Sequence, residues 1–287
     1  MHIKTAALSI VLGASAALGI FPSLAYAPAM TPATEAICQA QLNDEAVLSL
    51  LWMQRSAEYK ALCYQAYNAL RRHVSEELEK PHDKPMAVIL DIDETILDNT
   101  PFKARTVGTA IGKDKGAFSK WVAREEAKAL AGASETLSWI DSKGVALFYV
   151  SDRAADRDLE ATVANLKKAK IPVISSQVML SRGDTKTERF QKIEERYDVI
   201  AYVGDNLLDF PIRAEGADMN RRDHFVKQNR ELFGAAWIML PNPDYGSWEY
   251  ALCEGYKKLS AREKQRVRKE ALLMINEEKE EVRQTAN

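Results

Sequence analysis

Two carboxylates directly follow a short apolar run near residue 90. Met86 to Leu90 is apolar throughout, and Asp91 and Asp93 come next with Ile92 between them. Side chains alternate in an extended chain, so both carboxylates lie on the same side. Two like charges crowded at a strand end repel each other unless a cation joins them. Because carboxylate oxygens suit Mg²⁺, this pair predicts a magnesium site at the end of a strand.

A second acidic cluster follows another apolar run. Val199 to Val203 leads through Gly204 to Asp205, and Asp209 comes four residues later. The carboxyl ends of two parallel strands can be neighbours in a sheet, so Asp205 would complete the metal site. A lone aspartate after a strand is more often a helix cap than a catalytic group. Two such clusters in one chain favour a functional site.

A hydroxyl and an ammonium accompany these carboxylates. Ser151 follows a third apolar run, 145–150, and Lys186 opens the helix expected before the strand of Asp205. A phosphoryl group suits this set, because a cation and a lysine neutralise its charge and a hydroxyl binds one oxygen while a carboxylate attacks phosphorus. The alternative is that Ser151 is an ordinary turn residue and Lys186 part of a charged helix surface.

The order of apolar runs and amphipathic stretches predicts an α/β fold. Near-continuous apolar runs are typical of strands buried on both faces of a parallel sheet, with helices between them. In such a sheet ligands bind at the carboxyl ends of the strands. The expected strands are 86–90, 145–150, 171–174, 199–203 and 236–240, and the expected helices are 118–131, 133–142, 156–169 and 185–197.

Helical segments flank this α/β region. Residues 34–80 predict two helices, and residues 261–287 predict a charged helix docked near its start. We therefore expect a core over residues 81–246, with segments 28–80 and 247–287 packed together as a smaller helical domain.

The motifs resemble those of class C acid phosphatases, subfamily IIIB of the haloacid-dehalogenase (HAD) superfamily. The likeness spans about residues 87–256 and implies a Rossmann-like core with phosphomonoesterase activity. The segments that carry it are Asp91–Phe102, Phe148–Arg153, Tyr202–Asn206, Asn220–Arg222 and Met239–Glu249.

The resemblance implies roles for the first acidic residues. Asp91 would be the nucleophile, which forms an aspartyl-phosphate, and Asp93 would be the general acid. Mg²⁺ would be the cofactor, held by the Asp91 carboxylate, the Asp93 backbone carbonyl and the Asp205 carboxylate.

The remaining site residues are also implied by the resemblance. Ser151 and Lys186 would bind phosphoryl oxygens, and Asp209 would support the metal waters or orient Lys186. Related enzymes often hydrolyse nucleoside 5′-monophosphates and hold the base between aromatic rings. Tyr245 matches one of these rings, and Phe118 is the candidate for the other.

Three features depart from the family pattern. Asp152 stands where relatives usually have asparagine, which predicts an added charge near the site. Ile111 lies near a position that is often aromatic in relatives, and the segment 181–187 is shorter than usual. The alternatives are a phosphatase or phosphotransferase of broad specificity, or a non-catalytic binding protein.

The N-terminus predicts export. After Lys4, an apolar run covers 6–21, and small residues lead to Ala27 and Ala29. This arrangement is typical of a secretory signal peptide, residues 1–27, with cleavage after either alanine. An uncleaved anchor is the alternative. The predicted location is the periplasm or the medium.

Composition and cysteines narrow the function classes further. The 287 residues include 39 Lys and Arg against 41 Asp and Glu, so no basic excess favours nucleic-acid binding. Cys38 lacks the preceding residues of a lipoprotein cleavage site, so we expect no lipid anchor. Cys38 and Cys63 could form a disulfide that leaves Cys253 over, or all three could be thiols. The resemblance allows a homodimer.

Overall fold

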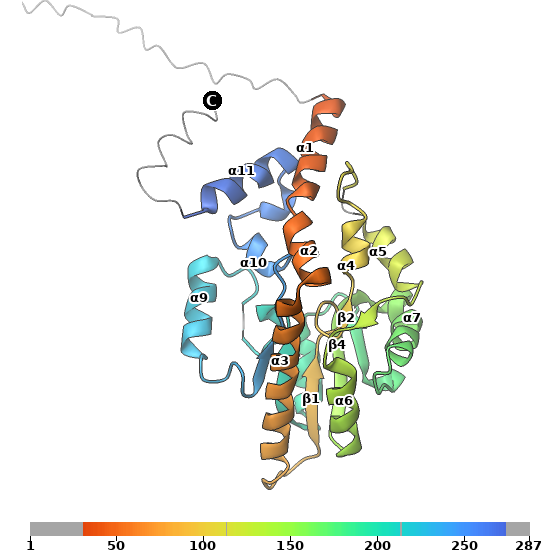
Figure 1. Cartoon of the computed structure of the whole chain (residues 1–287). Helices are drawn as coiled ribbons and strands as arrows, with labels where there is room; N and C mark the ends of the chain where they lie inside the picture. The colour runs from red at the N-terminus through yellow and green to blue at the C-terminus, as the bar shows by residue number, and fades with distance from the viewer. Residues whose placement is uncertain (1–30, 113, 213, 274–287) are drawn as a thin grey trace, which may run out of the picture. The chain divides into compact units, whose positions relative to one another are not determined.

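A five-stranded sheet lies at the centre of the computed structural model, which describes residues 31–112, 114–212 and 214–273 (Figure 1). The strand order is β5-β4-β1-β6-β7, and each neighbouring pair is parallel. The strands are β1 (Met86–Leu90), β4 (Ala146–Ala154), β5 (Val178–Ser181), β6 (Asp198–Gly204) and β7 (Trp237–Met239). The predicted α/β class with a parallel sheet is confirmed.

Both faces of the sheet are buried, which explains the near-continuous apolar runs. In β1, Val88 and Leu90 join the hydrophobic core on one face, and Ala87 and Ile89 join the core on the other. This alternation follows from the pleat of a strand. The helices that contribute to the first core are α3 (Ala57–Glu77), α6 (Ala133–Ser142) and α7 (Ala155–Lys168), and α8 (Lys186–Glu194) contributes to the second.

The N-terminal part contains three helices where the sequence predicted two. Ser56 breaks the run, since its backbone is extended and its hydroxyl accepts a hydrogen bond from the Tyr59 amide at 3.0 Å. Such a cap starts a new helix. The helices are α1 (Pro32–Asp44), α2 (Val47–Arg55) and α3. Of these, α3 packs against the sheet and so belongs to the core.

The two ends of the described chain pack together. Helix α11 (Ala261–Ala271) lies against α1, and Arg268 of α11 pairs with Glu45 at 2.6 Å and with Glu249 (Figure 1). Helix α2 lies against α4 (Thr100–Ala104). The described residues from Pro32 onward form one compact unit.

Two predicted elements are wrong in their placement. The strand expected at 171–174 is irregular chain, because Pro172 cannot donate a ladder hydrogen bond. The strand that joins the sheet instead is β5, which comes a few residues later. The helix expected at 118–131 ends at Val122, and Glu125 adopts a left-handed φ of 54°. Residues 128–129 then form β3, which pairs with β2, and neighbouring residues could not reveal that distant partner.

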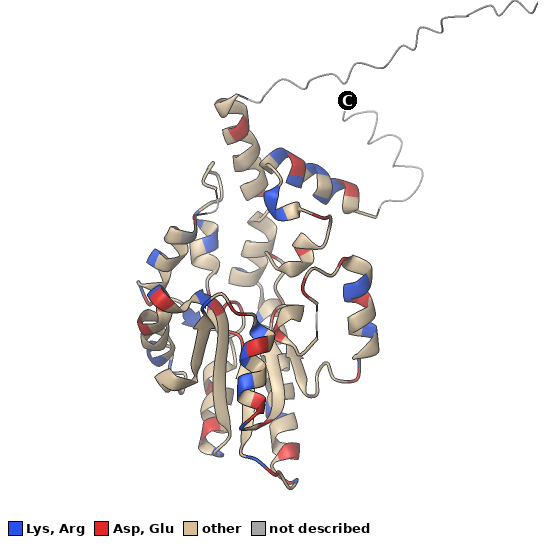
Figure 2. Ribbon diagram, turned by 180° about the vertical axis from the view of Figure 1, so that it is seen from behind, with Lys and Arg blue, Asp and Glu red and all other residues tan. Residues whose placement is uncertain are grey.

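The remaining elements are short and lie around the sheet. Charged residues of both signs line the outer helices, as Figure 2 shows for α9 and α11. These elements are β2 (Leu97–Asp98), β3 (Lys128–Ala129), α5 (Lys115–Val122), α9 (Met219–Gln228), α10 (Ser247–Tyr250) and the 3₁₀ turns Ser175–Gln177, Leu207–Asp209 and Tyr256–Lys258.

The three cysteines are free thiols, so the Cys38–Cys63 disulfide is absent from this structure. Cys38 and Cys63 are buried. Within the described residues, no helix is both long and apolar enough to cross a membrane. The predicted signal peptide lies outside the described residues.

Candidate active site

The predicted chemistry-bearing residues meet at the carboxyl edge of the sheet. Asp91 follows β1, Asp205 follows β6, and Ser151 lies near the end of β4. Because β1 lies between β4 and β6, the three positions are neighbours. The Asp91 amide donates to the Val203 carbonyl at 2.9 Å, which ties the first acidic turn to the strand that carries the second.

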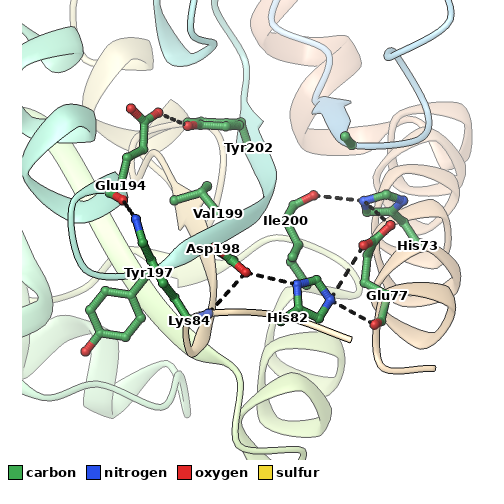
Figure 3. Close-up of a pocket in the computed structure, with 11 residues that line it drawn as sticks. His73, Glu77, His82, Lys84, Glu194, Tyr197, Asp198, Val199, Ile200 and Tyr202 are labelled. Carbon is green, nitrogen blue, oxygen red and sulfur yellow. Dashed lines mark hydrogen bonds and ion pairs between the residues drawn. The ribbon is translucent and has the colours of Figure 1, made fainter. Parts of the chain in front are cut away.

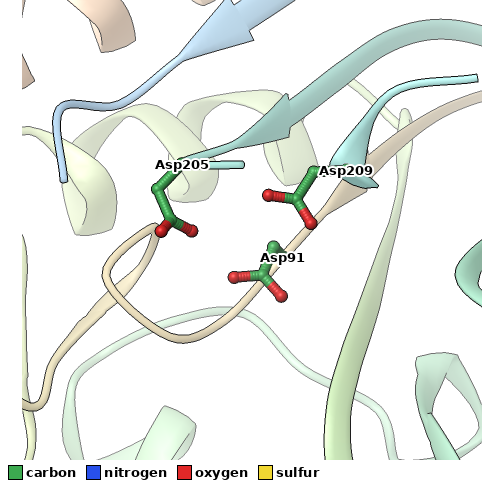
Figure 4. Close-up of side chains that lie close together, drawn as sticks. All are labelled: Asp91, Asp205 and Asp209. Atoms are coloured by element: carbon green, nitrogen blue, oxygen red, sulfur yellow. The ribbon is translucent and has the colours of Figure 1, made fainter. Parts of the chain in front are cut away.

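Three carboxylates converge there. Asp91, Asp205 and Asp209 each place an oxygen within 4.8 Å of the others, and Figure 4 shows the three side chains pointing toward one another. The hydroxyl of Thr95 lies 3.2 Å from Asp91 Oδ2 and 3.1 Å from Asp205 Oδ1, so it bridges the first and second clusters. Thr95, which the sequence analysis gave no role, thus contacts both acids.

Lys186 enters this cluster from the first turn of α8. Its Nζ donates to Asp91 and, at 2.6 Å, to Asp209. Thr185 and Glu188 form a capping box that fixes the start of this helix. Burial alone would lower the pKa of Lys186, but the charges of Asp209 and Asp91 outweigh it and raise that pKa, so the ammonium stays charged.

Asp209 holds the lysine in place. Its Oδ1 accepts from Lys186 and its Oδ2 accepts from the Asn206 amide at 2.8 Å. A Cβ at Gly204 would overlap the Asp209 side chain, so glycine is required there for this close approach. Of the two predicted roles for Asp209, these contacts favour the orientation of Lys186.

The cluster carries more negative than positive charge. Burial raises the pKa of Asp91 to about 7, against the pull of Lys186, and neighbouring Asp209 and Asp93 add to the rise. Burial, with Asp209 and Asp91 nearby, also raises the pKa of Asp205 well above its usual value. Excess charge on hard oxygen ligands is what a divalent cation such as Mg²⁺ neutralises. The residues present therefore fit such an ion.

Asp93 sits in a separate pocket of donors. Arg153 binds it with two nitrogens, Nη2 at 2.8 Å and Nε at 3.1 Å from Oδ1. The Ser151 hydroxyl donates at 3.1 Å and the Asn99 amide at 2.8 Å. Burial acts to raise the pKa of Asp93, but the charge and hydrogen bonds of Arg153 outweigh it and lower that pKa.

The partner Arg153 has no role in the sequence-based prediction, although a simple signal for it exists. It lies two residues after Ser151 in β4, so alternation puts both side chains on one side of the strand. An arginine is read as surface charge by default. Here its guanidinium is buried and also donates to the Thr162 hydroxyl at 3.0 Å.

Glu94 is a buried carboxylate in the turn that follows β1 and carries Asp91 and Asp93. It has a left-handed φ of 59°. Its side chain accepts a hydrogen bond from the Asn99 backbone amide at 2.7 Å and another from the Tyr245 hydroxyl. Burial, and then the charge of Asp93, raise the pKa of Glu94 to about 8. Glu94 therefore connects the turn after β1 to the loop that carries Tyr245.

The two aromatic candidates both lie near this turn, Tyr245 through Glu94 and Phe118 through Arg153. Lys103 Nζ is 3.6 Å from the centre of the Tyr245 ring. The Phe118 ring is 5.3 Å from that of Phe102 and 5.8 Å from the Arg153 guanidinium carbon, measured between centres. Both rings are thus linked to the surroundings of Asp93, and both are partly exposed.

The departures from the family pattern have structural counterparts. The Asp152 side chain is 69% exposed and pairs with the buried Arg189 at 2.6 Å, so its charge is directed to that arginine. Ile111 is exposed, and its carbonyl accepts from the Asn43 side chain at 2.9 Å.

A pocket of about 530 Å³ lies at the other end of the sheet and contains none of these groups (Figure 3). His82 lies 3.0 Å from the Glu77 carbonyl and 3.3 Å from an Asp198 oxygen, and His73 lies 2.8 Å from the Ile200 carbonyl. Its histidines are paired with neighbouring acceptors, so we place the candidate active site at the carboxyl edge.

Comparisons with known proteins find a matching family model and two similar solved structures. Residues 22–248 match the family model described as HAD superfamily, subfamily IIIB (acid phosphatase). The chain is similar to the class C acid phosphatase from Bacillus anthracis with tungstate bound, at 34% sequence identity and a TM-score of 0.79. That match covers 82% of this chain and 100% of the other. A second structure of the Bacillus anthracis enzyme matches with the same values.

Proposed function

Since this chain belongs to subfamily IIIB of the HAD superfamily, the acid phosphatases, and hydrolyses phosphomonoesters, we propose that it does so through a phosphorylated Asp91. The observation that carries the proposal is the buried contact of Asp91 with Lys186 beside Asp205. A carboxylate nucleophile, a cation for the phosphoryl charge and a metal ligand are thereby present in one place.

Two steps balance the reaction. Asp91 attacks phosphorus and forms an aspartyl-phosphate, while the leaving oxygen takes a proton from Asp93. Water then attacks the aspartyl-phosphate and gives a proton back to Asp93. This step releases inorganic phosphate and restores the Asp91 carboxylate. The pairing of Asp93 with Ser151 and Arg153 holds its carboxyl close to the hydroxyl that would bind the phosphoryl group.

Asp93 supports an acidic optimum for this reaction. The Arg153 guanidinium, against the effect of burial, lowers the pKa of Asp93. The carboxyl therefore gains the proton that it must donate only at acidic pH, while a bound Mg²⁺ would keep the Asp91 nucleophile ionised there. We expect the pH–rate profile to peak below neutrality, and a maximum well above pH 7 would contradict this assignment.

Asp91 and Asp205, with the Asp93 backbone carbonyl, are the groups that would hold Mg²⁺. The two oxygens of Asp209 are engaged by Lys186 and the Asn206 amide, which leaves Asp209 in a supporting role. A bound Mg²⁺ supplies charge neutralisation for a phosphoryl oxygen. The proposed phosphoryl ligands from the protein are Ser151 and Lys186. The Bacillus anthracis relative was solved with tungstate, a tetrahedral oxyanion like phosphate, which supports an oxyanion site here too.

Nucleoside 5′-monophosphates are the proposed substrates. Tyr245 contacts Glu94, Phe118 lies near the Arg153 that binds Asp93, and both rings are accessible in part. Aromatic rings near the proposed general acid suit a base, since stacking contributes about 1–3 kcal/mol per base.

A substrate panel tests this function. Phosphate release is measured from 5′- and 3′-nucleotides, nicotinamide mononucleotide, p-nitrophenyl phosphate and glycerol 2-phosphate, in Mg²⁺ and in a chelator. We expect Mg²⁺-dependent turnover with the highest kcat/KM for 5′-nucleotides. Equal kcat/KM across the panel would reject the nucleotide preference and leave the hydrolytic mechanism in place.

Export of the mature chain is also proposed, on the basis of the signal-like residues 1–27. Cell fractionation, with mass determination of the exported form, tests it. Activity retained in the cytosol at full length would contradict export. Sedimentation of the mature chain tests the homodimer that the resemblance allows.

A further inference from the structure

Arg189 of α8 is a buried arginine that the proposed chemistry does not use. Its side chain is 1% exposed. Nη1 donates to the Ser151 carbonyl at 2.6 Å and to the Met179 carbonyl at 3.1 Å, and Nε donates to the Thr185 carbonyl at 3.2 Å. Burying a guanidinium is costly unless its donors are satisfied, so this set of contacts indicates a specific task.

The three carbonyls belong to the ends of three elements. Ser151 lies where the ladder between β4 and β5 becomes irregular, and Met179 lies on β5. Thr185 is the N-cap of α8 and directly precedes Lys186. One rigid guanidinium therefore spans from the strand end that carries Ser151 to the helix start that carries Lys186.

Acidic side chains complete the surroundings of Arg189. Asp152 Oδ1 accepts from Nη2 at 2.6 Å, and Asp184 Oδ1 lies 3.6 Å from Nε. Alternation along β4 directs Asp152 away from the side of Ser151 and Arg153. The aspartate that departs from the family pattern thus serves as the carboxylate partner of this arginine.

We propose that Arg189 is a positioning residue that fixes Ser151 relative to Lys186, with Asp152 as its partner. The inference rests on the proposed phosphoryl-binding roles of Ser151 and Lys186 and deepens them. The planar guanidinium of Arg189 donates to three carbonyls and a carboxylate at once, which a lysine ammonium cannot do. Arg189 thereby sets how tightly the site holds a phosphoryl group or product phosphate.

The test is Arg189→Lys, with Arg230→Lys as the matched control. Arg230 is exposed and pairs with its neighbour Glu231. We measure kcat and KM for p-nitrophenyl phosphate, the inhibition constant of inorganic phosphate, and the melting temperature. In R189K we expect KM and the phosphate inhibition constant to rise about tenfold, because misplaced ligands weaken binding sharply. A folded R189K with wild-type constants overturns the proposal.

A double-mutant cycle separates positioning from a purely structural role. If Arg189 acts through Ser151, R189K has a much smaller effect on the phosphate inhibition constant in a Ser151→Ala background. Equal effects in both backgrounds overturn the proposal. If S151A and Lys186→Ala themselves leave phosphate inhibition unchanged, the proposed function of those two residues fails. If they raise the constant while R189K does not, only the inference about Arg189 fails.

Asp152→Ala carries the test if R189K does not fold. The Asp152 side chain is exposed, so its removal spares the core. We expect the phosphate inhibition constant to rise about threefold, because Arg189 loses its strongest charged partner but keeps three carbonyls. An unchanged constant in a folded D152A overturns the proposal.

Discussion

Strand β6 carries acidic residues at both of its ends, and the two ends handle charge differently. At the amino end, Asp198 faces His82, whose other ring nitrogen lies against the Glu77 carbonyl. At the carboxyl end, Asp205 lies beside two further carboxylates, and Lys186 is the one cation that pairs with this cluster among the described residues. One end matches acceptors with donors; the other accumulates negative charge.

This difference separates groups that stabilise the fold from groups that do chemistry. Paired polar groups contribute to stability and have little left for a ligand. Burial raises the pKa of Asp91 and, together with the anionic neighbours, that of Asp205. The carboxyl end of the strand therefore favours binding of a proton or a metal cation. The pocket alone does not lead to the proposed active site. The surplus of negative charge at the carboxyl end is the observation on which we propose it.

The largest predicted effect is the loss of turnover in Asp91→Asn. An amide cannot act as the nucleophile, so kcat should fall on the order of 10⁴-fold or more. Steady-state assays measure this, with Asp223→Asn as the control, because Asp223 is exposed on α9 and pairs with Lys227. A D91N variant that keeps a tenth of the wild-type kcat would contradict the proposed mechanism.

The surplus charge also predicts how stability depends on pH without metal. The folded pKa values of about 7 for Asp91 and about 8 for Glu94 lie above the unfolded values of about 4. Between these limits the folded protein binds more protons than the unfolded chain, so its stability falls as pH rises. In chelator, the melting temperature should drop by on the order of 5 °C from pH 5 to pH 8.

Added Mg²⁺ should oppose this loss. Carboxylates must be ionised to bind the ion, so its stabilising effect should grow with pH. The pKa of Lys186 is raised above its usual value, so the lysine stays charged throughout this window and adds no slope. Asp205→Asn should reduce both the pH slope and the Mg²⁺ effect. A melting temperature in chelator that rises steadily from pH 5 to pH 8 would contradict this prediction. It would show that the buried carboxylates do not carry an excess of negative charge.

A smaller effect is predicted for the aromatic Tyr245. Tyr245→Ala should raise KM for 5′-nucleotides about tenfold through lost stacking, and should leave KM for glycerol 2-phosphate near the wild-type value. Tyr245→Phe, which keeps the ring, is the matched comparison. An equal rise in KM for both substrates would indicate damage to the site rather than loss of base recognition.

The smallest effect is predicted at the amino end. His82→Ala should lower the free energy of unfolding by about 1 kcal/mol, since it removes contacts to Glu77 and Asp198, with kcat and KM unchanged. His224→Ala is the control because His224 is exposed on α9. Loss of activity in a stably folded H82A would contradict the claim that the amino end of β6 serves stability alone.

Local sequence was sufficient to predict the strand ends that carry the acids. β1, β4 and β6 are buried on both faces, so their apolar runs are long and end abruptly at polar residues. That pattern placed Asp91 and Asp205 correctly after neighbouring strands. It failed at 171–174, because an apolar run also arises where irregular chain is buried, as Ile171 is.

What local sequence did not predict depends on distant partners. Arg189 is a charged residue in a charged helix, so its sequence context predicts an exposed side chain. It is buried because it donates hydrogen bonds to the Ser151 and Met179 carbonyls, which lie far away in the sequence. Asp152 was expected to add charge near the site, but its partner lies on α8. The residues that we propose for the chemistry were therefore easier to place from the sequence than those that we propose hold them in position.

The most direct test is to trap the intermediate on Asp91. The enzyme is mixed with a saturating 5′-nucleotide and Mg²⁺, quenched in acid within one turnover, digested and analysed by mass spectrometry. We expect the peptide containing Asp91 to gain the mass of one phosphoryl group, and the same peptide from D91N to show no such gain. A phosphoryl group on another residue, or turnover with no modified peptide in any of the quenched samples, would contradict the proposed mechanism.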